Sequence, residues 1–218
     1  MDFTSQMTSL LSELRRERNG AAADAMRFYG KGCGLNLGVA LHTVRAIIAE
    51  TPRNHDFARY LYRQDVRELK IAALWLAEPA RVEVADLDEW SAGIVNSEIA
   101  EQAAMALFSR VGCIDDVIEQ WGASGEVLLV YTALLSAVRN PHCNAERTLA
   151  IIEGAVDSFA DNRLVGQGVV AAMTSLGERT PEAVATLAGR IKEKKTPTAS
   201  FVCDELSWRL EAFESSDN

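Results

Sequence analysis

Hydrophobic residues recur along the chain at intervals of three and four positions. This spacing places side chains on one face of an α-helix, so it predicts amphipathic helices that pack against one another. Such patterns run through six segments, whose ranges are 37–48, 66–76, 99–107, 127–138, 149–159 and 169–176. The short alternation RVEVADL lies too close to helical neighbours to predict a strand.

Proline and threonine mark where several of these helices begin or end. Pro79 follows the segment that is predicted to end near residue 76. Thr180 and Pro181 have the residue types of a helix N-cap and a first helical residue, and Thr196 and Pro197 repeat the pair before a last helix. The connections between helices are therefore short, as they are between antiparallel neighbours.

The fold class that follows is all-α. Roughly ten to twelve helices are expected, in pairs that recur about every 30–40 residues, which is the range of HEAT and armadillo repeats. We expect a curved α–α superhelix, a solenoid of HEAT-like helical repeats, that forms a single domain over residues 1–218. Residues 1–20 would form an N-terminal helix, 21–213 the repeats and 214–218 a tail. The same periodicity also allows a compact multi-helix bundle.

The charge of −9 is unevenly distributed. Up to residue 81, 12 Lys or Arg face 9 Asp or Glu, whereas residues 82–189 hold 5 basic and 16 acidic side chains. DNA affinity comes largely from Lys and Arg that neutralise phosphates, so the acidic middle argues against strong binding and only the basic first third favours it. No apolar run approaches the roughly 18–20 residues of a membrane span, and the start lacks the pattern of a signal peptide. We expect a cytoplasmic protein.

Cysteine and histidine are too scattered to predict a metal site. The four cysteines form no CxxC pair, and the adjacent His142 and Cys143 have no second pair of ligands nearby. The glycine-rich FYGKGCGLNLG, residues 28–38, lacks the strand and helix context of a phosphate-binding loop, so it predicts a turn. We therefore expect neither a metal nor a cofactor.

The stretch VNSEIAEQAAMALF, residues 95–108, raises the possibility of catalysis. Glu98 and Glu101 are three residues apart, so a helix would place them on one face, where paired carboxylates can divide acid and base roles. The alternative is structural. With Asn96 or Ser97 as N-cap, both glutamates lie in or next to the first turn, where the helix dipole favours negative charge in solvent.

Four basic residues of the first third, Arg45, Arg63, Arg67 and Lys70, are candidates for contacts with a DNA backbone. Acidic residues are interleaved with the last three, so these side chains could equally form solvated helix faces with exposed ion pairs.

Residues 26–82 contain five short elements of a recognisable pattern, which are Tyr29-Gly30, Val44-Arg45, Tyr60-Leu61-Tyr62, Glu68-Leu69-Lys70 and Ala77-Glu78-Pro79. Through these elements, residues 26–82 resemble the AlkD-like DNA alkylation repair proteins, and residues 168–191 are similar to the helix pair near the C-terminus of that family. The resemblance implies a superhelix of HEAT-like repeats that holds DNA on a concave, basic surface and excises alkylated bases.

The same resemblance implies that catalytic residues are missing. Active members carry a Trp-Asp-x-x-Asp segment, whose last Asp assists cleavage of the glycosidic bond. Here Glu98 stands at the position of the Trp and Gln102 at that of the Asp, although a slip of one residue would put Glu101 there. An arginine of the family is replaced within Val130-Tyr131, and a second Trp within Ala171-Ala172.

These observations lead us to expect a DNA alkylation repair family protein without catalytic activity. It would be a helical scaffold that binds a protein partner or, weakly, duplex DNA. One alternative is an active alkylpurine DNA glycosylase that excises N3- or N7-alkylated bases with Glu98 or Glu101. The other is a protein-interaction solenoid with no DNA role, which the acidic middle favours.

Overall fold

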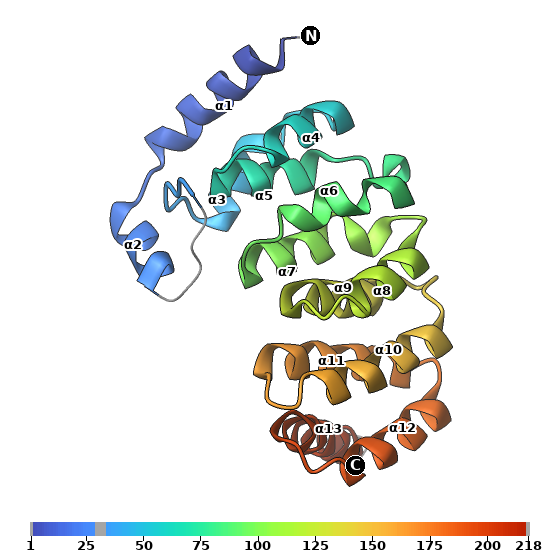
Figure 1. Cartoon of the computed structure of the whole chain (residues 1–218). Helices are drawn as coiled ribbons and strands as arrows, with labels where there is room; N and C mark the ends of the chain where they lie inside the picture. The colour runs from blue at the N-terminus through green and yellow to red at the C-terminus, as the bar shows by residue number, and fades with distance from the viewer. Residues whose placement is uncertain (1, 29–33, 217–218) are drawn as a thin grey trace. The chain divides into compact units, whose positions relative to one another are not determined.

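The computed structural model describes residues 2–28 and 34–216, with the side chains from residue 208 onward excepted. In this part of the chain all regular structure is helical apart from one isolated bridge between Leu35 and Val66 (Figure 1). The helices are α1 (Phe3–Arg16), α2 (Gly20–Phe28), α3 (Leu41–Ile48), α4 (His55–Tyr62), α5 (Arg67–Leu76), α6 (Leu87–Ala92), α7 (Ser97–Ala106), α8 (Ile114–Gly122), α9 (Val127–Arg139), α10 (Ala145–Ser158), α11 (Arg163–Gly177), α12 (Pro181–Glu193) and α13 (Pro197–Ser216), with three short 3-10 turns, η1 (Pro79–Arg81), η2 (Val84–Asp86) and η3 (Phe108–Arg110).

Asparagine begins four of these helices. In α4, α7, α10 and α11 the side-chain oxygen of the N-cap accepts a hydrogen bond from a backbone N–H of the first turn, at 2.9 to 3.1 Å. Each cap satisfies one of the N–H groups that a helix start leaves without a partner. Their residues are Asn54, Asn96, Asn144 and Asn162.

The first compact unit comprises Met1–Gly112. Helices α3, α5 and α7 pack side by side in one layer, and α4 packs against α5 from a second layer. Helix α1 touches α3 and α4. The core between the layers is apolar and includes Leu61, Leu69, Leu74 and Ile99, all fully buried.

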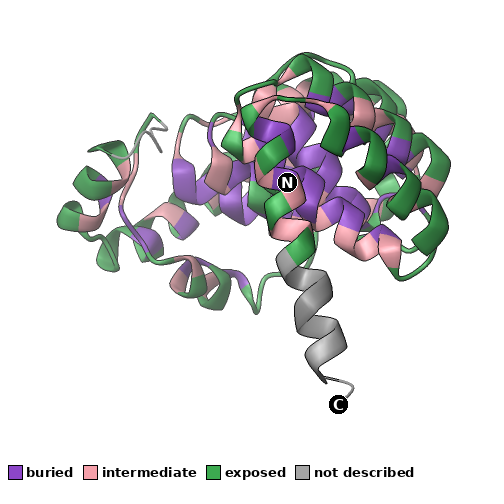
Figure 2. Cartoon of the chain, turned by 90° about the horizontal axis from the view of Figure 1, so that it is seen from below, coloured by how far each residue is buried: buried purple, intermediate pink, exposed green. Residues whose placement is uncertain are grey.

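The second compact unit comprises Cys113–Asn218 and repeats the two-layer scheme. In one layer α9 packs against α11, and α11 against α13. In the other layer α8 packs against α10, and α10 against α12. Its core includes Ile152, Val165, Met173 and Ile191, which are fully buried. Figure 2 shows the buried residues in purple on the faces where helices meet.

This arrangement confirms the prediction of an all-α fold of helical repeats. The described residues hold thirteen α-helices, slightly more than the expected ten to twelve. RVEVADL is not a strand; its residues lie in and around η1 and η2. The turn predicted for the glycine-rich stretch falls partly on residues 29–33, which lie outside the described residues. The single domain stays a prediction.

None of the helices that the structure describes has the length and hydropathy needed to cross a lipid bilayer.

Candidate functional site

Helix α7 carries the stretch for which catalysis was considered. Asn96 is its N-cap, and its Oδ1 accepts the backbone N–H of Ile99 at 2.9 Å. Glu98 therefore lies in the first turn and Glu101 in the next, as the sequence predicts. The helix dipole favours a carboxylate at position 98. The side chain of Glu98 also makes direct contacts with another helix.

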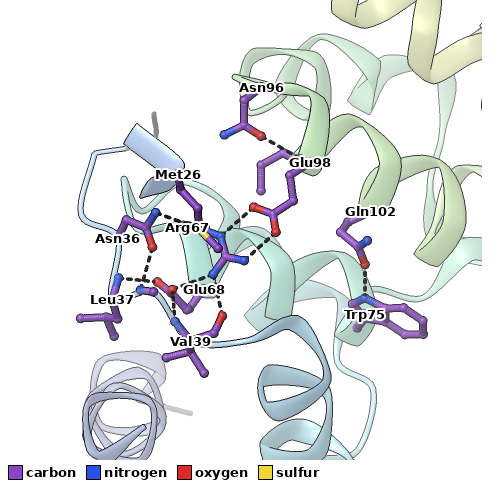
Figure 3. Close-up of polar contacts among 12 residues, drawn as sticks. Met26, Asn36, Leu37, Val39, Arg67, Glu68, Trp75, Asn96, Glu98 and Gln102 are labelled. Carbon is purple, nitrogen blue, oxygen red and sulfur yellow. Dashed lines mark hydrogen bonds and ion pairs between the residues drawn. The ribbon is translucent and has the colours of Figure 1, made fainter. Parts of the chain in front are cut away.

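Glu98 forms a two-pronged ion pair with Arg67 (Figure 3). The Nε of Arg67 donates to Oε2 of Glu98 at 2.7 Å, and its Nη2 donates to Oε1 at 2.6 Å. The Nη1 of Arg67 donates to Oε1 of Glu68 at 2.8 Å and to the backbone oxygen of Val39 at 2.9 Å. Every nitrogen of this guanidinium thus has a partner.

The Arg67 cluster is buried. The side chain of Arg67 is 1% exposed, that of Glu68 is fully buried and that of Glu98 is 15% exposed. Burial by itself would lower the pKa of Arg67, but the ion pairs with Glu98 and Glu68 hold that pKa above its usual value. The expectation of a solvated Glu98 is therefore wrong, because this carboxylate neutralises a buried arginine.

This pairing limits what Glu98 can do chemically. A carboxylate that swung out towards a substrate would leave the guanidinium of Arg67 buried beside Glu68 alone. Breaking a buried ion pair from one side costs about 3–5 kcal/mol. In this arrangement Glu98 joins α7 to α5 through Arg67.

Gln102 is also held in place. Its side chain is buried, and its Oε1 accepts a hydrogen bond from the indole Nε1 of Trp75 at 3.2 Å (Figure 3). The guanidinium carbon of Arg45 lies 4.2 Å from the centre of the Trp75 ring, which is the geometry of a cation–π contact. Helices α3, α5 and α7 each contribute one of these side chains.

Glu68 is a further organising residue, although it was not among the candidate site residues. Its two carboxylate oxygens accept the backbone N–H groups of Leu37 and Val39, at 3.1 and 3.2 Å. It thereby fastens the segment before α3 to α5 (Figure 3). The signal available in the sequence was a charged residue inside RELKIAALWL, a helix that is almost entirely apolar from Leu69 onward.

The four basic candidates do not gather on one exposed surface. Arg67 is fully enclosed, and Lys70 is buried with its Nζ donating to the backbone oxygen of Tyr62 at 2.9 Å. Arg63 is exposed and pairs with Glu89 at 2.9 Å. Arg45 is exposed. The expectation of solvated helix faces is thus wrong for Arg67 and Lys70. Neither side chain is exposed enough to contact a phosphate.

In the second unit, the positions at which the resemblance implies an arginine and a second Trp belong to the core. Val130 and Tyr131 of α9 are buried, as is Ala172 of α11. These side chains belong to the packing between the helices of that unit.

Taken together, the paired helices in two layers are those of a HEAT-like helical repeat protein. A solved structure described as "A new family of proteins related to the HEAT-like repeat DNA glycosylases with affinity for branched DNA structures" is similar to this chain with a TM-score of 0.68 and 17% sequence identity. The similarity covers 87% of this chain and 83% of that one. The family model for the DNA alkylation repair enzyme matches residues 10–200. The chain belongs to this DNA alkylation repair family. None of the curated proteins is significantly similar to it in sequence.

Proposed function

We propose that this protein is a member of the DNA alkylation repair family that binds DNA without excising bases. The observation that carries the proposal is that two side chains of α7 are held by contacts with α5. Glu98 is held by Arg67 and Gln102 by Trp75, so two of the candidate positions serve the packing of α5 against α7.

The chemistry of base excision explains why the contacts of Glu98 and Gln102 bear on catalysis. Cleavage of a glycosidic bond develops positive charge on the sugar, and a nearby carboxylate stabilises that charge. The carboxamide of Gln102 carries no charge, and the charge of Glu98 is already neutralised by Arg67. Glu101, which is exposed, is the remaining carboxylate of this stretch.

DNA binding is supported by the family and by the structural neighbour, which is described as having affinity for branched DNA. The family match also runs across both compact units, which supports the expectation of a single functional domain. The acidic middle of the chain opposes the phosphate backbone, so we expect weak, salt-sensitive binding.

Binding of labelled DNA over a range of salt concentrations tests the proposal. A plain duplex and a four-way junction of the same base composition should both bind at about 50 mM salt, and affinity should fall as salt increases. Binding of the junction would extend to this chain the affinity for branched DNA that is described for its neighbour. Absence of binding to either DNA at that salt would contradict the proposal and favour the alternative of a protein-interaction solenoid.

A further inference from the structure

A groove lies beside the Arg45–Trp75 contact in the first unit. Its volume is about 500 Å³, which is within the range of sites that hold small ligands. The residues that line it come from α3, from the end of α5 and from the connection between α3 and α4. The polar and aromatic ones among them are His42, Arg45, Thr51, Arg53 and Trp75.

Two arginines place positive charge at this groove. Arg45 lies over the face of Trp75, and Gln102 fixes the edge of that ring. Arg53 donates from Nη1 to the backbone oxygen of Ala77 at 2.6 Å, which ties it to the end of α5. Each guanidinium is thus held by a neutral partner and keeps other N–H groups for a ligand.

These two arginines make no ion pair within the described residues, whereas Arg59, Arg63 and Arg67 each pair with a carboxylate. A third guanidinium, that of Arg110 in η3, is not part of the groove lining but lies close enough to Arg53 for the two charges to repel each other. Its Nη2 donates to the backbone oxygen of Ala106. Burial and the nearby charge of Arg53 lower the pKa of Arg110. In a chain with a net charge of −9, uncompensated arginines that repel one another indicate a place for an anion.

We propose that this groove binds a phosphate group of a nucleic-acid strand, with Arg45 and Arg53 as the donors and Trp75 as the wall beside it. The inference deepens the proposed function, because it names the surface of the first unit that would contact DNA. Phosphate suits the groove because guanidinium groups bind it through paired, charge-assisted hydrogen bonds. An aromatic wall also suits the sugar or base attached to the phosphate.

Substitution of the two donors tests the groove. We would measure binding of a labelled duplex by the single variants Arg45→Gln and Arg53→Gln and by the double variant. Arg16→Gln is the matched control, because Arg16 is exposed on α1 of the same unit and makes no ion pair among the described residues. Each groove variant should bind about tenfold more weakly than wild type, and the slope of log affinity against log salt should become shallower by about one.

The duplex would be used with a 5′-hydroxyl and with a 5′-phosphate to distinguish the source of the phosphate. An equal loss for both forms would assign the groove to the phosphodiester backbone, and a loss restricted to the phosphorylated form would assign it to a strand end. Either result supports the inference. If both groove variants match Arg16→Gln while wild type binds DNA, the inference fails and the proposed function stands.

A second measurement covers the case in which wild type binds no DNA. Inorganic phosphate would be titrated into the ¹⁵N-labelled protein, with the indole N–H signal of Trp75 assigned through Trp75→Phe. The signal should shift in wild type and in Arg16→Gln and stay fixed in the Arg45→Gln, Arg53→Gln double variant. Absence of a shift in wild type would overturn the inference. Unchanged urea midpoints would show that the variants are folded.

Discussion

At the scale of single residues, the guanidinium of Arg67 organises the first unit. It joins α5 to α7 through Glu98 and to the segment before α3 through Val39, and it is almost completely buried. A buried charge is tolerated only when its partners are in place, so the cost of losing a partner is high.

Replacing Glu98 tests this account of Arg67. Glu98→Ala should lower the free energy of unfolding by about 3–5 kcal/mol, because Arg67 would remain buried with half of its hydrogen bonds unmade. Urea unfolding measures the change. Glu13→Ala, on the exposed side of α1, serves as the control and should stay within about 0.5 kcal/mol of wild type. A loss for Glu98→Ala as small as that of the control would contradict the buried ion pair.

The histidine that begins α4 makes stability depend on pH. His55 is 2% exposed, and among the described residues neither of its ring nitrogens has a hydrogen-bond partner. Burial, then the charges of Arg81 and Arg59, lower its pKa. The unfolded chain binds a proton near pH 6.5, so the contribution of neutral His55 is complete above about pH 6.5. It is lost as the pH falls towards the lower folded-state pKa.

Urea unfolding at pH 7.5 and pH 5.5 would detect this effect. His55→Leu should show a smaller loss of stability between the two pH values than wild type, because it removes the group that takes up the proton. His142→Leu is the matched control, because His142 is exposed, and it should lose as much as wild type does. If His55→Leu and wild type lose the same amount, the buried neutral imidazole is not the source.

At the scale of elements, the segment from Leu35 to Ala40 is held by contacts that lie far apart in sequence. Leu35 pairs with Val66 as an isolated bridge, and Glu68 accepts two N–H groups of the segment. Gly38 has a φ of 71°, and a Cβ added there would lie 2.0 Å from the backbone oxygen of Asn19. The route of this segment therefore requires glycine at position 38.

Substitution of two glycines by alanine should have opposite effects. Gly38→Ala should destabilise the protein by at least about 1–2 kcal/mol, since a left-handed backbone disfavours a Cβ and the contact with Asn19 adds to the cost. Gly154→Ala, inside α10, should stabilise it by about 0.5–1 kcal/mol, because a Cβ there meets no atom within 4 Å. Urea unfolding compares them. Wild-type stability of Gly38→Ala would show that the segment can take another route.

Many of the elements, though not α4, α6 and α8, could be predicted because their signals are local. Apolar spacing, prolines and asparagine caps act within one or two turns, so the bounds of α5, α9 and α12 follow from their own residues. The contacts of the candidate site were harder to predict from the sequence. Arg67 and Glu98 are 31 positions apart, and a charged residue in a sequence suggests solvent. Only the packing of α5 on α7 turns this pair into a buried contact.

At the scale of the whole molecule, the family favours DNA binding, whereas the charge distribution opposes it. The family is one of DNA repair enzymes, whereas residues 82–189 carry a net charge of −11. The proposed function, weak DNA binding without catalysis, would reconcile the two. It requires the basic first third of the chain to supply the phosphate contacts, and Arg45 and Arg53 are exposed there.

The most direct test of this account is the release of 7-methylguanine and 3-methyladenine from alkylated DNA by the purified protein. The account predicts that both bases are released at the spontaneous rate, because Glu98 is bound to Arg67 and Gln102 carries no charge. Release above the spontaneous rate that Glu101→Gln abolishes would contradict it and identify Glu101 as a catalytic acid.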